Sequence, residues 1–178
     1  MTIETFDTRN VEIVYRHELR QCVYPFKGSL EEALYSQAEV VVFTTWDPKS
    51  NCIQGDNSFL ESHHKAYFYI GSKRFGYNLN WIVRLSPSDR PNQYNRLPQD
   101  VAVLESQMAV AIPSNHYISL LASTVKDGNI PITDERGYLI STDRAHLTKF
   151  GAIFFGRKVL LPSPYGKMLI EAALRKRV

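Results

Sequence analysis

The sequence predicts an α/β fold with a parallel sheet. Three runs of strand-forming composition, Val40–Thr44, Ala66–Ile70 and His116–Leu121, alternate with segments of helical periodicity, and this alternation is typical of βαβ units. The first run, VVVFT, is β-branched and aromatic without a polar interruption, which indicates a strand buried on both faces. A chain of 178 residues suits one domain with its own core, so we expect residues 1–178 to form a single domain.

The other elements of the first half follow from local patterns. Asn10–Tyr15 alternates in polarity and suits an edge or half-buried strand. Ser29 is the expected N-cap of a helix that runs to about Gln37, and Glu32 would complete a capping box. The segment Ser86–Pro98 is rich in Pro, Asn and Ser, which predicts a long surface loop.

The second half adds three helices and another loop. Apolar residues at helical spacing predict a helix over Asp100–Val110. The segment Asp127–Thr142 shows no period and is expected to be irregular. An apolar helix is predicted over Leu147–Leu160 and an amphipathic one over Lys167–Arg175.

Composition and charge exclude several classes of protein. The net charge of +3, from 21 basic and 18 acidic residues, is too small and too scattered to indicate a nucleic-acid partner. No apolar run approaches the roughly 20 residues of a membrane span, and the first residues lack the basic and apolar regions of a signal peptide. On this sequence alone we expect a cytoplasmic protein. If the chain is part of a longer protein, this expectation no longer holds.

No cofactor or metal motif is present in the sequence. His63 and His64 are adjacent but lack a third ligand nearby, so we interpret them as solvated side chains rather than a metal site. Cys22 and Cys52 form no C-x-x-C pair and are expected to be reduced thiols, with a disulfide between them as the alternative.

The segment from Gly137 to Ala152 carries the chemistry. Asp143 precedes His146 by three residues. A carboxylate at this spacing can accept the imidazole Nδ1 proton and fix the tautomer, which leaves the other nitrogen to act as a general base for a hydroxyl nucleophile. The alternative interpretation is a surface Asp and His without a catalytic role.

This segment resembles the last motif block of SGNH (GDSL-like) hydrolases, and most of all the form found in bacterial polysaccharide O-acyltransferases. That block reads Asp-x-x-His-Leu-(Ser/Thr)-x-x-Gly-Ala. It is matched residue by residue at Asp143, His146, Leu147, Thr148, Gly151 and Ala152. The resemblance spans residues from about 38 to 160 and is specific in this final block.

The resemblance implies a three-layer α/β/α fold with a flavodoxin-like sheet and a Ser–His–Asp mechanism. His146 would relay the proton, Asp143 would orient His146, and the substrate would be a carbohydrate ester or an acyl donor. Donors after the third strand would hold the oxyanion, and Thr45 and Trp46 occupy that position here. The family's usual Gly-x-Asn-Asp is absent there, and Trp46 has a core aromatic as its alternative interpretation.

The family's first block, an apolar strand followed by Gly-Asp-Ser or Gly-Asn-Ser, is not found. The only similar run is Gly55-Asp56-Asn57-Ser58, so Ser58 is the weak candidate nucleophile; the alternative is a polar loop. Without the first strand, Val40–Thr44 would lack a neighbour on one side. The sequence therefore leaves three alternatives open: a longer polypeptide, self-association through the sheet edge, or pairing with Asn10–Tyr15.

Two functions remain open at the level of sequence. One is an ester-handling domain, either a carbohydrate O-acetyltransferase or an esterase, that works with a serine not identified in this chain. The other is a non-catalytic SGNH-like module that binds a carbohydrate or a partner chain. In open α/β sheets, ligands bind beyond the carboxyl ends of the strands. Three segments follow predicted strand ends, so we expect them to converge at that edge: Trp46-Asp47, Gly71-Ser72 and residues 127–146.

Overall fold

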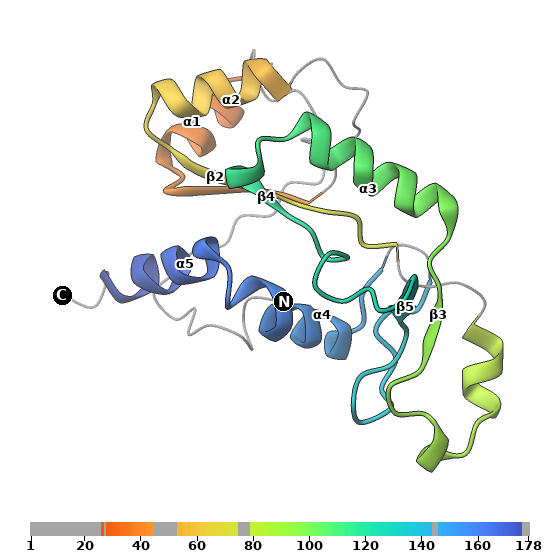
Figure 1. Cartoon of the computed structure of the whole chain (residues 1–178). Helices are drawn as coiled ribbons and strands as arrows, with labels where there is room; N and C mark the ends of the chain where they lie inside the picture. Colours follow the sequence, from red (N-terminus) through yellow and green to blue (C-terminus); the bar gives the residue numbers. More distant parts are fainter. Residues whose placement is uncertain (1–25, 27, 45–52, 75–78, 144–145, 176–178) are drawn as a thin grey trace.

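A computed structural model of the chain describes residues 26, 28–44, 53–74, 79–143 and 146–175. The fold is α/β, with helices around a parallel sheet of three strands (Figure 1). Several sequence predictions lie outside the described residues: the strand Asn10–Tyr15, Cys22, Cys52, Thr45 and Trp46.

The parallel sheet has the order β1-β2-β4. Strand β1 (Val40–Phe43) pairs in register with β2 (Ala66–Ile70), from Val40 opposite Ala66 to Phe43 opposite Tyr69. Strand β4 (Tyr117–Ile118) pairs with the end of β2. The predicted strand His116–Leu121 is thus much shorter. On one side, His116 is still part of a 3₁₀ helix. On the other side, the Ser119 hydroxyl accepts the N–H of Ala122, and the chain turns there.

Helices cover both faces of this sheet (Figure 1). On one face lie α1 (Ser29–Gln37), α2 (Ile53–Ser62) and α3 (Gln99–Ala111). On the other lie α4 (Lys149–Phe155), the π-helix η4 (Gly156–Leu160) and α5 (Pro164–Arg175).

The alternation of side chains along β2 produces these two layers. Tyr67 and Tyr69 pack with α1, α2 and the end of α3, whereas Phe68 and Ile70 pack with α4, η4 and α5. Because successive strand residues point to opposite faces, one apolar run can serve both cores. All four side chains are almost completely buried.

Strand β1 does not meet the prediction of burial on both faces. Val42 is 39% exposed, and the other residues of β1 are only half-buried. Among the described residues, β1 pairs only with β2 and is the edge of the sheet. An uninterrupted apolar run therefore predicted the strand correctly but not its coverage, since coverage depends on what lies beyond its outer edge.

Helix predictions succeeded in position and failed at the ends. The helix over Asp100–Val110 is confirmed as α3, and the first one as α1. Ser29 is not its N-cap, however: Gly28 caps α1 in an extended conformation without a side-chain bond. The predicted Leu147–Leu160 helix begins at Lys149 and changes to a π-helix at Gly156. The last helix starts at Pro164 rather than Lys167, and proline at a first turn is well tolerated.

Two segments predicted as loops contain a second, antiparallel sheet. Strand β3 (Tyr94–Arg96) pairs with β5 (Asn129–Pro131), with Asn95 opposite Ile130. Two 3₁₀ helices, η1 (Leu79–Arg84) and η2 (Pro87–Asp89), precede β3. Strands of three residues give no measurable sequence period, so turn-forming residues dominated the prediction.

Candidate active site

A backbone ladder carries the Asp143–His146 segment. The N–H of Ile132 donates to the carbonyl of Gln93 at 2.9 Å, the N–H of Ile140 donates to Ile132 at 2.9 Å, and the N–H of Thr148 donates to Ile140 at 3.0 Å. Ile132 and Ile140 are 1% and 0% exposed. The apolar side chains thus fix the ladder to the core, and its far end presents the two candidate catalytic residues.

A tight turn precedes the site and is held by the buried side chain of Asp134. Its Oδ1 accepts the N–H of Arg136 at 3.0 Å and the N–H of Tyr138 at 2.8 Å. Gly137 has φ +82°, and a Cβ there would lie 2.9 Å from the Cβ of Arg90, so both conformation and space require glycine. The sequence reasoning missed Asp134, although Asp followed by Gly three residues later is a readable turn signal.

The predicted contact between Asp143 and His146 is present. Nδ1 of His146 lies 2.7 Å from Oδ2 of Asp143, and the His146 N–H donates to Oδ1 of Asp143 at 2.8 Å. A carboxylate only accepts hydrogen bonds, so Nδ1 carries the proton and Nε2 of the neutral ring is left as an acceptor. The side chains of His146 and Asp143 are 79% and 53% exposed, so the ring faces solvent.

Ser141 ties together the two ends of the loop that holds this pair. Its hydroxyl lies 2.5 Å from the carbonyl oxygen of Asp143 and 2.7 Å from that of His146. The N–H of Thr142 also donates to the His146 carbonyl at 3.1 Å. Ser141 is 2% exposed, so its hydroxyl serves the loop backbone and is turned away from the imidazole. The sequence reasoning gave Ser141 no role.

Thr148 and Gly151 explain the rest of the motif block. The Thr148 hydroxyl is the N-cap of α4: it accepts the Gly151 N–H at 3.0 Å and donates to the carbonyl of Leu139. A Cβ at Gly151 would lie 1.9 Å from the carbonyl oxygen of Ile140. Glycine therefore lets α4 lie directly against the ladder, and the helix start is positioned next to His146.

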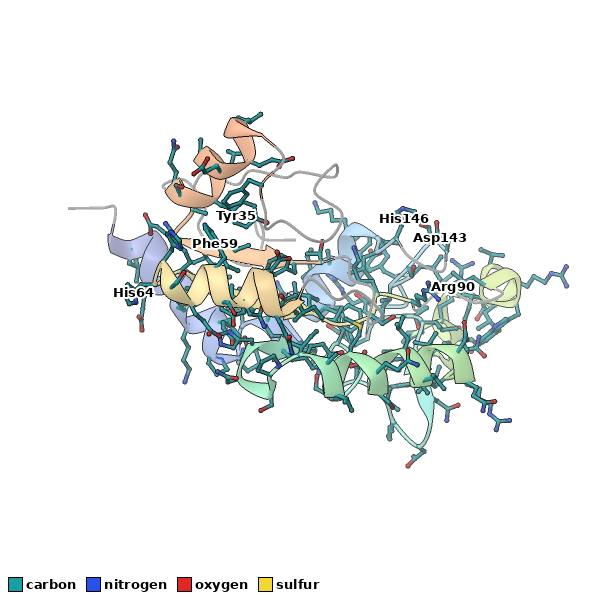
Figure 2. All side chains as sticks on the ribbon, turned by 90° about the horizontal axis from the view of Figure 1, so that it is seen from above. Tyr35, Phe59, His64, Arg90, Asp143 and His146 are labelled. Atoms are coloured by element: carbon teal, nitrogen blue, oxygen red, sulfur yellow. The ribbon has the colours of Figure 1, made fainter. Side chains whose placement is uncertain are left out.

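The structure places the pair toward the carboxyl ends of the parallel strands. In Figure 1, β2 and β4 run toward the side where β5 and the start of α4 lie. Figure 2 shows Asp143 and His146 together there, apart from Tyr35, Phe59 and His64 on the α1–α2 side.

Ser58, the candidate nucleophile, is not brought to this pair, and Thr45 and Trp46 lie outside the described residues. Ser58 lies on an exposed position of α2, not in the polar loop expected for it, while the neighbouring Asp56 and Asn57 point inward and are buried. In both figures α2 lies apart from the Asp143–His146 segment. Within the described part of the chain, no serine hydroxyl hydrogen-bonds to the His146 ring.

The strand end at Gly71-Ser72 is filled by protein rather than open to a ligand. Ser72 is 7% exposed, and its N–H donates to Oε2 of Glu105 at 3.4 Å. The Ser119 hydroxyl donates to the other oxygen of Glu105. Burial and the adjacent Glu105 carboxylate raise the pKa of Tyr117, which packs against Gly71. Glu105 of α3 therefore joins the ends of β2 and β4.

Comparison of the chain with protein-family models, with curated proteins and with solved structures gives no match. Over the described ranges, no three His, Cys, Asp or Glu side chains gather as metal ligands. None of the helices seen there is long and apolar enough to span a membrane. Among the described residues, the candidate site is the exposed Asp143–His146 pair on its hydrogen-bonded loop.

Proposed function

We propose that this chain is an ester-handling domain of SGNH type, a carbohydrate O-acetyltransferase or esterase, in which Asp143 and His146 form the proton relay. The observation that supports this proposal is the 2.7 Å contact of His146 Nδ1 with Asp143, with the ring otherwise open to solvent. In that geometry Asp143 fixes the tautomer and stabilises the imidazolium, and Nε2 takes the proton of an attacking hydroxyl.

The hydrogen bonds and close contacts around the Asp143–His146 pair favour a catalytic role over a chance surface contact. An exposed ion pair contributes little to stability, yet the surrounding loop is held by the Ser141 hydroxyl, by the Thr148 cap and by the glycine contact at Gly151. Rigid positioning of a general base is what proton transfer needs. The nucleophile in this proposal is a serine that has not been identified in this chain.

The test uses the protein as expressed from its own gene. A fluorophosphonate probe, which reacts with activated serines, and an activated acetyl ester are offered to the wild type, to His146→Gln and to His63→Gln. His63 is the matched control because it is exposed and has no carboxylate partner. Its Nδ1 donates to the Phe59 carbonyl at 2.8 Å, so this nitrogen cannot take a proton from the Ser62 hydroxyl 3.0 Å away. Probe labelling and ester turnover should fall by about 10²–10⁴ in His146→Gln and stay unchanged in His63→Gln. Equal labelling in all three proteins contradicts the relay.

A purified chain of these 178 residues is expected to show little or no ester turnover, because a relay without a nucleophile has nothing to acylate. Turnover by this chain that His146→Ala abolishes would contradict that expectation and direct attention to Ser58 or to another hydroxyl; Ser58→Ala then decides between them.

The second candidate function is a non-catalytic module that binds a carbohydrate or a partner chain. The position of Ser58 on α2, apart from His146, favours it. A wild-type protein that takes up no fluorophosphonate but still binds a glycan would support this function over the first.

A further inference from the structure

Two stacked aromatic rings, the exposed Tyr138 and the half-buried Phe150, lie on the hairpin of residues 129–151 that carries the proposed relay. Tyr138 precedes Asp143 by five residues, and Phe150 follows His146 by four. Their rings stack at a centroid distance of 4.0 Å with 9° between their planes. Tyr138 nevertheless stays 45% exposed, so the stack leaves much of its ring open to solvent.

The backbone on both sides holds these rings in place. The Tyr138 N–H donates to Oδ1 of Asp134 at 2.8 Å, and the Asp134 N–H donates to the Tyr138 carbonyl at 2.9 Å. Phe150 stands in the first turn of α4, whose cap is the Thr148 side chain. A flat apolar surface that is already ordered binds with little loss of conformational entropy.

The aromatic pair is also close to the relay. Four residues of fully extended chain span at most about 14 Å, so the Cα atoms of Phe150 and His146 are closer than that. A ligand of several rings is therefore long enough to contact both the aromatic pair and His146.

The cation in contact with the aromatic pair is already paired with a carboxylate. The Arg136 guanidinium lies 5.1 Å from the Tyr138 ring centroid and 5.6 Å from that of Phe150. Its NH2 nitrogen forms an ion pair with Oδ2 of Asp134 at 3.2 Å. A cation already neutralised by a buried carboxylate offers little to an anion, so the surface favours a neutral ligand with an apolar ring face.

We propose that Tyr138 and Phe150 form a binding subsite for a neutral oligosaccharide, which places one sugar ring against Tyr138 while a ring further along the glycan lies beside His146. The subsite rests on the proposed function for its role in catalysis, but the binding itself does not require ester chemistry. It gives the domain a preference for a polymeric substrate over a monosaccharide ester.

The experiment measures glycan binding by calorimetry, without any ester present. The probes are neutral tetrasaccharides of glucose, N-acetylglucosamine, mannose and galactose, and the matching monosaccharides. Wild-type protein and Tyr138→Phe should bind at least one tetrasaccharide and bind its monosaccharide at least tenfold more weakly, and Tyr138→Leu should lose on the order of tenfold in affinity. Trp81→Leu is the control, because Trp81 is also an exposed aromatic but lies on η1.

The outcomes separate this inference from the proposed function. Failure of every tetrasaccharide to bind, equal affinity in Tyr138→Leu, or an equal loss in Trp81→Leu overturns the subsite, whatever the ester assay shows. Affinity that falls steeply with added salt also overturns it, since that result indicates an anionic ligand. Normal glycan binding by the protein expressed from its own gene, with neither fluorophosphonate labelling nor ester turnover, would retain the subsite and contradict the relay.

Discussion

Two regions, the hairpin of residues 129–151 and the β1–α2 region, differ in how far apart in sequence their hydrogen-bond partners lie. Around the relay, at the closed end of this hairpin, polar groups bond to partners 5 and 9 residues away: Ser141 to the His146 carbonyl, and Thr148 to that of Leu139. The open end of the hairpin is joined to Gln93 and Arg90 through Thr133, 40 and 43 residues away. In the β1–α2 region, the contacts are distant. The Tyr69 hydroxyl donates to Asn57 of α2 at 2.7 Å, and the Lys65 ammonium donates to the carbonyl of Ala38 at 3.0 Å.

This difference explains why the chain shows half of a catalytic site clearly. The relay itself consists of two residues three positions apart whose direct contacts are local, so a short motif identifies it. A nucleophile or oxyanion donor must arrive from another strand, and its position depends on the whole sheet. The candidates for those roles either lie outside the described residues or, like Ser58, lie on a helix apart from the relay.

The largest expected effect is alkaline destabilisation of the β1–α2 region. Burial raises the pKa of Tyr35, Tyr67 and Tyr69, whereas an unfolded tyrosine titrates near pH 10. The folded chain therefore keeps these hydroxyls neutral: their contribution is complete below about pH 10 and is lost as the pH rises above it. At pH 11, each tyrosine that stays neutral in the folded state but ionises in the unfolded state lowers the free energy of unfolding by about 1.4 kcal/mol. Three such tyrosines lower it by roughly 4 kcal/mol.

Denaturant unfolding at pH 7, 10 and 11 measures this loss. Tyr69→Phe should reduce the loss between pH 10 and pH 11, because one buried ionisable hydroxyl is removed. Tyr138→Phe is the control, since Tyr138 is 45% exposed, and should leave the loss unchanged. A loss that is the same in all three proteins would show that ionisation of Tyr69 does not contribute to it.

The next effect is on the hairpin. Gly151→Ala would place a methyl carbon 1.9 Å from the Ile140 carbonyl oxygen. The atoms it meets are all backbone atoms of Ile140, so α4 must move away from the ladder. We expect a loss of about 3 kcal/mol in unfolding free energy, at the upper end for overpacking, and weaker His146–Asp143 contact. Gly28→Ala is the control, because no atom lies within 4 Å of its Cβ position, and should cost about 1 kcal/mol or less. Equal costs would contradict the close contact.

A smaller effect is expected from Ser141→Ala. The change leaves the carbonyls of Asp143 and His146 without the hydroxyl that now bonds to them, in a position 2% exposed. Loss of a buried hydrogen bond costs about 1–2 kcal/mol. Ser62→Ala is matched to it, since Ser62 also donates to a carbonyl but is exposed, and should cost less than half as much. Thermal or denaturant unfolding gives both values.

The sequence predicted more of the fold than of the site. Buried strands with dense apolar composition, such as Ala66–Ile70, and the helix at α3 were found because burial imposes a period or a composition. The helix α2 was missed because its apolar residues are few and the buried Asp56 and Asn57 resemble a loop. Strands β3 and β5 were missed because three residues give no period.

At the site, the Asp143–His146 contact was predictable because the spacing alone brings the two side chains together. The role of Gly151 is clear only in three dimensions, since the sequence does not show that Ile140 approaches it. Burial of Ser72 under Glu105 was not predictable either, because the two residues are 33 positions apart. The sequence thus predicts contacts between residues that are near one another in the chain, and only the structure reveals contacts between distant residues.

The smallest change in stability, and the sharpest comparison, is expected from Asp143→Asn. The ion pair is largely exposed, so the loss should stay below about 1 kcal/mol. An asparagine oxygen can still accept the His146 N–H, which preserves the loop. The amide can also donate to the ring, however, so Nδ1 no longer needs to carry the proton. In nitrogen NMR spectra at alkaline pH, the neutral His146 ring should change from the Nδ1–H tautomer to mostly Nε2–H, which removes the general base. Asp134→Asn is the contrast: it should leave the tautomer of His146 intact but destabilise the fold more, because Asp134 is 2% exposed and its Oδ2 accepts two bonds from Arg136, where the asparagine NH₂ group would face other donors. An unchanged tautomer in Asp143→Asn would mean that Asp143 does not orient His146.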